Sequence, residues 1–481
     1  MDIRVDRDLK YFLGVGILVF FLVIREAVLL PLTHDEYATI MVSYQSIFDI
    51  ISYRDPVPNN HILNTLLLKF NIVVFGDNIF SNRIHNVLSF IPFFIFSVLI
   101  AKRITKVFLL QLVLISFLVL QPFLLDFFAV TRGYGLSISF QIVSIYFAIL
   151  YIQDSKSSDL FYSVLFGAIG VYSNFTLLNY FLPLNGLLFY YSFLKNYKLH
   201  FKKFKIEFLM AFIITFILGA LSFLPFSKMI STNQFVFWSS NNFFKDTIVT
   251  LFDSLRIGVT YFKWNGVVYA LVFLGLIFSL FLMVLVLSNK KIFKDDLFRF
   301  SFFLLFLVII YNNLQFYVAK VPFLNSRTAL FFVPLVALFV FSQINVLYTH
   351  SKKYGTAISI VLILFCTQHF ARGYNGRVNY EWYFNQNTYE FLDELMFQIN
   401  SNNLSKPVLL DCHWFYHPSL TYHINQKYRG IIELLPYHKE TNKSSNAIFY
   451  YSEPGEADVL SENFIRIKEF SGSHSILWKH K

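Results

Sequence analysis

Residues 11–36 read YFLGVGILVFFLVIREAVLLPLTHDE, an apolar run that ends in Thr33-His34-Asp35-Glu36. Asn59-Asn60-His61 follow in the same polar interval before the next apolar run. A helix that spans a bilayer needs only apolar side chains, so an acidic pair and a histidine just beyond it need a separate explanation. Ionisable groups gathered outside a span indicate chemistry at the membrane surface.

The composition defines the class of protein. Of the 481 residues, 56% are hydrophobic and only 14% are charged, and the mean hydropathy is +0.55. The runs 107–120, 207–226 and 266–288 are apolar on every helical face, which excludes a water-soluble globule. The sequence therefore predicts an integral membrane protein. Its net charge of +11 does not indicate nucleic-acid binding, because basic loops that face anionic lipid account for it.

About eleven membrane-spanning helices are predicted. They cover residues 11–30, 86–101, 107–124, 134–152, 160–173, 176–194, 207–226, 266–288, 297–313, 328–343 and 355–370. Lys and Arg gather at 4–10, 102–106, 195–205, 290–294 and 352–353. With eleven spans all five clusters fall on one side, which the positive-inside rule identifies as cytoplasmic. The N-terminus is therefore predicted to be cytoplasmic and the C-terminus extracytoplasmic.

Two domains are predicted. Residues 1–370 form an all-α transmembrane domain, in which 31–85 is the first extracytoplasmic loop. The first apolar run lacks a small-residue cleavage site and is expected to act as an anchor. From residue 371 polar residues replace the apolar runs, and a helix at 389–399 with strands near 407–411, 447–452, 463–470 and 475–479 predicts a small α/β domain. Cys366 and Cys412 do not make a disulfide framework.

The first extracytoplasmic loop is predicted to contain two short helices. Ile40, Tyr44, Ile47, Phe48 and Ile51 recur at helical spacing, which is typical of an amphipathic helix in the membrane interface. The second helix covers 62–75, begins after Asn59-Asn60-His61 and ends before Gly76-Asp77. Carboxylate and imidazole groups at the polar starts of two such helices predict a cleft at the membrane surface.

The acidic pair has two interpretations. Thr33-x-x-Glu36 fits a capping box, so one interpretation of the pair is simply a favourable helix start. Neighbouring helical residues point about 100° apart, so with Glu36 in the cap, Asp35 is the carboxylate left to face a substrate. A capping role for Glu36 predicts that Gln replaces it at modest cost in stability. His61 is either part of the same cleft or an ordinary interfacial histidine.

The order of short motifs is informative. Asp35-Glu36 after the first span is followed by Asn60-His61, Phe75-Gly76-Asp77, Ser81-Asn82-Arg83, Thr131-Arg132-Gly133-Tyr134 and Asn325-Ser326-Arg327. Over residues 1–345 this layout resembles the GT-C membrane glycosyltransferases, particularly the protein O-mannosyltransferases and the lipid A aminoarabinose transferases. One departure is that Ile62-Leu63 stands where many members have Pro-Pro.

The resemblance implies a GT-C fold in a bacterial inner membrane and an inverting transfer of a sugar. The donor is a polyprenyl-phosphate-type lipid, and the acceptor is a glycan, lipid or protein on the outer face. Asp35 is implied as the base, with Glu36, Asn60 and His61 as supporting residues. No cofactor is expected, although a divalent metal is an alternative; the first loop has no second acidic motif of the Asp-x-Asp kind.

The donor phosphate is expected to meet basic side chains at the outer ends of the spans. Arg327 and Arg132 are the first candidates, with Arg83 and Lys320 behind them. The alternative for each is that it reaches a lipid head group as an interface anchor.

The C-terminal tail contains a second group of ligand-type residues, Asp411-Cys412-His413, His417 and His423. On a helix, His413 and His417 would share a face and could hold zinc, but Pro418 favours a turn there.

Two other classes of function fit a chain with many spans. A lipid-linked sugar flippase or transporter would be expected to place ionisable residues inside its spans and to show repeat halves. An O-antigen-type polymerase or ligase also uses lipid-linked sugars, and the early acidic pair disfavours it. The gathering of polar residues on one side of the membrane favours a transferase.

Overall fold

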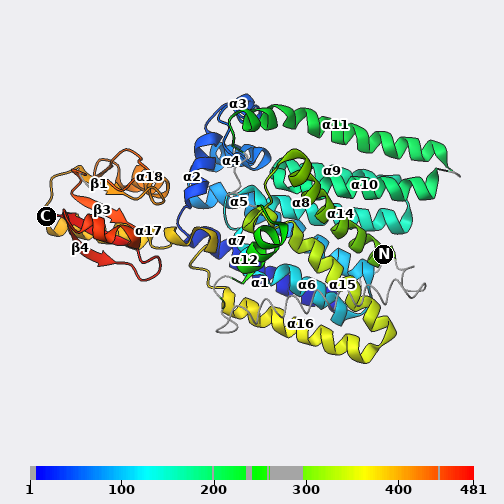
Figure 1. The fold of residues 1–481 in the computed structure, drawn as a ribbon. Coiled ribbons are helices and arrows are strands. Elements are labelled where there is room, and N and C mark those ends of the chain that lie inside the picture. The colour runs from blue at the N-terminus through cyan, green and yellow to red at the C-terminus, as the bar shows by residue number, and fades with distance from the viewer. Residues whose placement is uncertain (1–6, 198–199, 235–240, 257–258, 260–295, 443–444) are drawn as a thin grey trace.

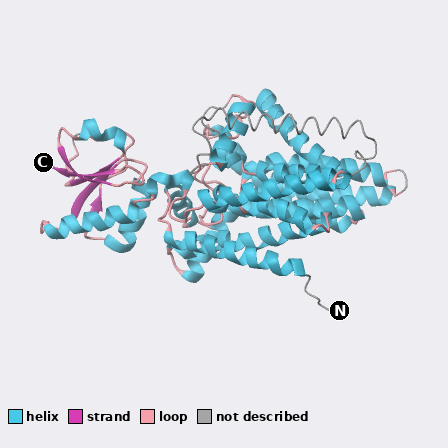
Figure 2. Cartoon of the chain, turned by 90° about the horizontal axis from the view of Figure 1, so that it is seen from below, coloured by secondary structure: helices cyan, strands magenta, loops and turns pink. Residues whose placement is uncertain are grey.

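The computed structural model describes residues 7–197, 200–234, 241–256, 259, 296–442 and 445–481. Most of these residues lie in helices, and a small sheet is confined to the C-terminal part (Figure 2). The long helices run side by side as a bundle, with the sheet beyond one end and the start of α1 at the other (Figure 1).

Seven described helices are long and apolar enough to cross a membrane. They are α1 (Arg7–Leu29), α5 (Ile79–Ile104), α8 (Gly133–Asp154), α11 (Phe201–Ser231), α14 (Asp296–Ala319), α15 (Phe332–His350) and α16 (Lys352–Gly373). Three more predicted spans coincide with α6 (Phe108–Val119) continued by α7 (Pro122–Asp126), with α9 (Ser157–Ser173), and with α10 (Leu178–Asn196). The predicted span 266–288 lies outside the described residues, so the total of eleven remains a prediction.

Polar contacts between the helices have the form expected in a membrane bundle. Ser144 on α8 and Ser163 on α9 each donate to the other's backbone carbonyl, at 2.7 and 2.9 Å. At the end of the bundle distant from the sheet, Arg103 near the end of α5 pairs with Asp154 at the end of α8, at 2.5 Å. These contacts bury small side chains within the bundle and keep charges at its ends, which is how helices associate in lipid.

The first loop contains three helices rather than two: α2 (His34–Ser43), α3 (Ile47–Ile51) and α4 (Ile62–Phe75). The capping box at the start of α2 is confirmed, because the amides of Thr33 and Glu36 donate to each other's side chains at 2.9 and 3.3 Å. The single amphipathic helix predicted after Glu36 is wrong. The Ser46 hydroxyl accepts from the Asp49 amide at 3.1 Å and so begins a new helix, as an N-cap residue does. The bounds of α4 match the prediction.

Short helical turns connect the long helices near the sheet domain. They are η1 (Phe175–Leu177), η2 (Phe243–Val249), α12 (Thr250–Leu255), η4 (Ser326–Ala329) and η5 (Tyr380–Asn385). Of these, η4 leads into α15 and η5 follows α16, so both lie at the same end of the bundle as α2.

The C-terminal part is a five-stranded mixed sheet with the order β2-β1-β3-β5-β4. Its elements are α17 (Thr388–Ser401), β1 (Val408–Cys412), α18 (His417–His423), η6 (Ile424–Tyr428), β2 (Ile432–Leu434), β3 (Phe449–Ser452), η7 (Pro454–Glu456), α19 (Ala457–Leu460), β4 (Phe464–Glu469) and β5 (Ile476–His480). β1 is parallel to β2 and β3, whereas β5 is antiparallel to β3 and β4. The four predicted strands correspond to β1, β3, β4 and β5; the three-residue β2 was not predicted.

Candidate active site

Three segments that are distant in the sequence bring Asp35, Arg132 and Arg327 together. Asp35 lies in the first turn of α2, Arg132 immediately precedes α8, and Arg327 lies in η4. One Asp35 carboxylate oxygen, Oδ2, is 3.0 Å from Nη2 of Arg327 and 3.6 Å from Nη2 of Arg132. The side chain of Arg327 is 25% exposed, against 2% for Arg132. Arg327 is therefore the cation of this cluster that a ligand reaches most easily.

The charge on Asp35 is stabilised by its neighbours. Burial alone would raise the pKa of Asp35, but the guanidinium groups of Arg327 and Arg132 outweigh it and hold the pKa below its ordinary value. His34 acts in the same direction. Asp35 is therefore a carboxylate at neutral pH, and it stays a weak base for as long as both arginines face it.

Arg132 is fixed by the first loop. Its Nη1 donates to the Thr39 hydroxyl at 3.1 Å and its Nη2 donates to Asn59 Oδ1 at 3.1 Å. Asn60, which the sequence placed in the site, instead bonds within the loop: it donates to the Ile50 carbonyl and accepts from Thr65, both at 3.0 Å. Asn59 rather than Asn60 thus orients the cation beside Asp35.

His61 lies at the start of α4 with its ring edge-on to Tyr134, the two centroids 5.3 Å apart. Burial, followed by the charges of Arg132 and Arg327, lowers the pKa of His61 well below its ordinary value, so the ring is neutral. Its Nε2 is buried and has no hydrogen-bond partner among the described residues. A neutral imidazole with a vacant nitrogen can bind a substrate hydroxyl.

Gly133 is required for His61 to lie so close to α8. A Cβ at this position would fall 2.8 Å from Cβ of His61 and 2.0 Å from the Ser173 carbonyl oxygen. No side chain fits there without displacing the backbone.

Glu36 and Arg83 form a separate pair that is fully buried. Arg83 Nε donates to Glu36 Oε1 at 2.7 Å and its Nη2 donates to Oε2 at 2.6 Å. The remaining donors of Arg83 bond the backbone carbonyls at the end of α1, and the Thr131 amide donates to Glu36 at 2.8 Å. Arg83, a predicted phosphate ligand, is therefore committed to joining α1, α2 and α5, and we do not retain it in the site.

Lys320 is exposed at the end of α14. Within the described structure no contact joins its side chain to Asp35, Arg132 or Arg327, so its predicted role in phosphate binding stays a prediction.

Two residues of the site were not predicted from the sequence. Glu381 in η5 accepts from Nη1 of Arg327 at 2.9 Å, and the ring of Trp382 lies 5.0 Å from the guanidinium carbon. The sequence does contain a signal that could have identified them. It is a single acidic residue among aromatic residues just after the last span, in Asn379-Tyr-Glu-Trp-Tyr383.

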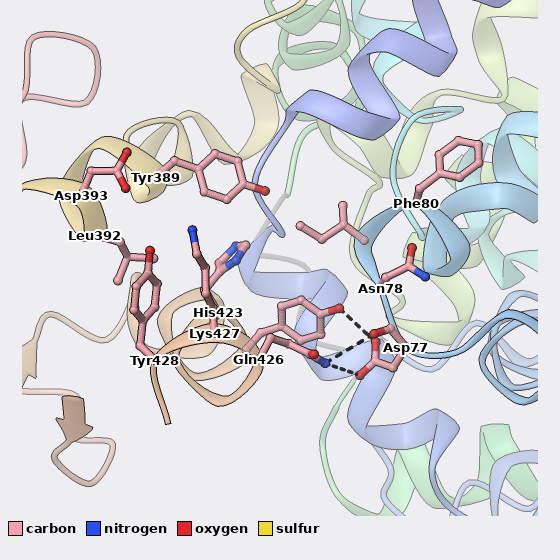
Figure 3. A pocket seen from close by; sticks show the side chains of 12 residues that line it. Asp77, Asn78, Phe80, Tyr389, Leu392, Asp393, His423, Gln426, Lys427 and Tyr428 are labelled. Atoms are coloured by element: carbon pink, nitrogen blue, oxygen red, sulfur yellow. Dashed lines mark hydrogen bonds between the residues drawn. The ribbon is translucent and has the colours of Figure 1, made fainter. Parts of the chain in front are cut away.

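The C-terminal domain holds the segment that precedes Asp35. The Leu32 amide donates to His423 at 3.3 Å, the Ser419 hydroxyl donates to the Leu32 carbonyl at 2.6 Å, and the His34 amide donates to Asn385 at 3.1 Å. Beside this contact lies a cavity of about 530 Å³ between the start of α5 and the helices α17 and α18. Gln426 donates to the Asp77 carboxylate at 3.1 Å, as Figure 3 shows by a dashed line. The Tyr422 hydroxyl donates to the other oxygen of Asp77 at 3.0 Å.

The surroundings of Asp35 do not fit a divalent metal. Two guanidinium groups lie against its carboxylate, and a third cation there would be repelled by both. In the tail, His413 pairs with Glu453 at 2.8 Å, whereas His417 lies 3.0 Å from the Leu435 carbonyl. No group of three metal-ligating side chains occurs among the described residues.

No protein-family model matches the chain, and no curated protein matches it in sequence. Solved structures do match. ArnT from Cupriavidus metallidurans in the apo state matches with a TM-score of 0.51 and 10% identity, covering 98% of this chain and 97% of that one. ArnT bound to undecaprenyl phosphate gives 0.49 and 9%, with the same coverage. The Archaeoglobus fulgidus oligosaccharyltransferase in complex with Zn and sulfate gives 0.42 and 13%, covering 97% and 73%.

Of these three matches, the one to apo ArnT has a TM-score above 0.5 and supports a comparison of folds, and at 10% identity the comparison is limited to the fold. It extends over the helical bundle and the C-terminal sheet together, since nearly all of both chains is covered. The resemblance predicted from the order of the motifs is confirmed at the level of the fold: this chain has the same fold as ArnT.

Proposed function

We propose that the chain is a membrane glycosyltransferase that takes a sugar from a polyprenyl-phosphate-type donor and passes it to an acceptor on the outer face. The observation that carries the proposal is the carboxylate of Asp35 beside Arg327 and Arg132 at one end of an apolar bundle. A base and a phosphate-binding cation are the two groups this transfer requires. The ArnT-like fold supports the same reaction class.

The donor binds with its hydrocarbon tail along the spans and its phosphate on Arg327 and Arg132. In this orientation the chain crosses the membrane eleven times, with its N-terminus in the cytoplasm and the sheet domain outside. The acceptor hydroxyl attacks the anomeric carbon from the face opposite the phosphate. The new bond forms as the sugar–phosphate bond breaks; the phosphate leaves with the electron pair, and Asp35 takes the hydroxyl proton. Inversion follows from this geometry.

Binding of the donor also makes Asp35 a stronger base. A donor phosphate draws Arg327 toward itself, because a phosphate offers the guanidinium more charge and more acceptor oxygens than one carboxylate does. The positive charge of Arg327 then acts on the phosphate as well as on Asp35. Its effect on Asp35 becomes weaker, and the pKa of that carboxylate rises. The base is strongest when the donor is in place.

The reaction class is tested by mass spectrometry of the outer-surface glycans, lipids and proteins of cells with and without the gene. A sugar residue is expected to disappear on deletion and to return with the wild-type chain. If undecaprenyl phosphate binds the purified protein but no outer-surface molecule changes in mass, the chain moves the lipid-linked sugar instead of transferring it.

Replacing Arg327 with Ala is expected to weaken the binding of undecaprenyl phosphate by about tenfold to a hundredfold, because a charge-assisted hydrogen bond contributes roughly 1.5–3 kcal/mol. The measurement is a titration of the purified protein in detergent, followed by native mass spectrometry. Folding is expected to be harmed less than donor binding, since the Arg327 side chain is partly exposed and Arg132 remains beside Asp35.

The matched control is Arg377→Ala, which removes an exposed arginine from the segment between α16 and η5 and should leave the affinity unchanged. Equal affinities of the wild-type and Arg327→Ala proteins would make Arg327 an interface anchor.

The proposed orientation predicts the behaviour of topology reporters. A reporter fused after residue 480 is expected to be active only outside the cytoplasm, and one fused near Lys202, at the start of α11, only inside. A cytoplasmic C-terminus would place Asp35 on the wrong side for an outer-face transfer and would contradict the span count.

A further inference from the structure

Arg327 is shared by two carboxylates from opposite ends of the sequence. Its Nη2 lies 3.0 Å from Oδ2 of Asp35, while its Nη1 lies 2.9 Å from Oε1 of Glu381. The Ser326 hydroxyl donates to the other Glu381 oxygen at 3.3 Å. Glu381 belongs to the segment that joins the last span to the C-terminal domain, so this segment reaches the centre of the site.

The backbone around Glu381 is held firmly. The Tyr380 amide donates to the buried carboxyl group of Asp126 at 3.2 Å, and the Glu381 amide donates to Asn379 at 3.1 Å. Trp382 is only 3% exposed and packs into the core of the bundle beneath the Arg327 guanidinium. A carboxylate on so constrained a segment fixes one edge of the guanidinium and leaves the other edge to Asp35.

We propose that Glu381 is a positioning residue that keeps Arg327 in the site while Arg327 exchanges Asp35 for the donor phosphate. This rests on the proposed function. The negative charge of Glu381 offsets part of the charge on Arg327, which weakens the hold of Arg327 on Asp35. Glu381 thereby keeps Asp35 a stronger base than Arg327 and Arg132 alone would permit.

The charges that face the two carboxylates decide the sign of the effect. The cations Arg327 and Arg132 face Asp35, together with the imidazoles of His34 and His61, while Arg327 and the buried carboxyl group of Asp126 face Glu381. Gln at position 381 removes one negative charge and keeps an oxygen that accepts from Nη1. The field at Asp35 then becomes more positive, which favours its ionised form and lowers its pKa. A more positive site also attracts a phosphate more strongly.

The test is Glu381→Gln in the full-length protein. The acidic limb of the kcat/KM pH profile is expected to move about one pH unit lower. The kcat is expected to fall about threefold to tenfold as the base weakens, and undecaprenyl phosphate is expected to bind at least as tightly as to the wild type. Glu381→Asp keeps the charge and should restore the position of the acidic limb. Glu433→Gln, an exposed carboxylate on β2, should change none of these quantities.

A readout independent of activity is the infrared titration of the carboxyl band that Asp35→Asn removes, which should move to lower pH in Glu381→Gln. If this titration and the pH profile stay unchanged, the proposal for Glu381 is overturned while the transferase is unaffected. The proposal is overturned in the same way if Glu381→Gln only lowers thermal stability and donor affinity. If the wild type shows no transfer but the Asp35 titration still moves, the proposed function fails and the coupling of Glu381 to Asp35 stands.

Discussion

Replacing Asp35 with Asn is expected to lower the rate of sugar transfer by about two to four orders of magnitude, the usual contribution of a positioned base. Asn keeps the shape of the side chain and an oxygen that can accept from Arg327, but it takes up no proton. The measurement is the single-turnover rate of the purified protein with its lipid-linked donor. Because both arginines keep Asp35 ionised in the free protein, kcat/KM of the wild type should fall only well on the acid side of neutrality.

Donor binding separates this effect from a failure to fold. Asp35→Asn removes a negative charge between two arginines, so undecaprenyl phosphate should bind at least as tightly as to the wild type. Asp55→Asn, an exposed carboxylate of the same loop, is the matched control and should retain full activity. Undiminished transfer by Asp35→Asn would exclude Asp35 as the base.

Local sequence patterns correctly predicted those helix bounds and caps that are determined by residues close together in the sequence. The bounds of α4 followed from an apolar run between His61 and Gly76, and Gly76 has a φ of +78°, which favours glycine. The capping box of α2 needs only the spacing of Thr33 and Glu36. The break between α2 and α3 was missed because the apolar spacing continues across it, although Ser46 is a favoured N-cap residue.

Local sequence patterns did not predict which charged side chains pair with each other. Arg83 was expected at the donor phosphate because it lies at the outer end of a span, yet it bonds Glu36, which is 47 positions away in the sequence. Glu381 lies 54 positions from Arg327, and no local pattern marks a carboxylate that shares a cation with another. Both contacts depend on which helix ends meet in space, and helix lengths and loop charges do not determine that.

The pairing of Glu36 with Arg83 changes what is expected of Glu36→Gln. A residue that only caps α2 would tolerate Gln at modest cost, as the sequence alone indicated. Both side chains are fully buried, however, and Gln leaves the guanidinium of Arg83 without its counter-charge. Removing one partner of a buried ion pair costs roughly 3–5 kcal/mol. Glu36→Gln is therefore expected to be recovered in low yield and to unfold at a clearly lower temperature than the wild type in the same detergent.

Two variants separate the buried charge from the cap. Asp49→Asn breaks a pair with Arg54 whose side chains are 25% and 69% exposed, and an exposed pair contributes no more than about 1 kcal/mol. Glu36→Gln combined with Arg83→Gln removes both buried charges, so the double variant should be more stable than the sum of the two single changes predicts. If Glu36→Gln instead unfolds like the wild type, Glu36 serves only as the cap of α2. The pair would then contribute little to holding α1, α2 and α5 together.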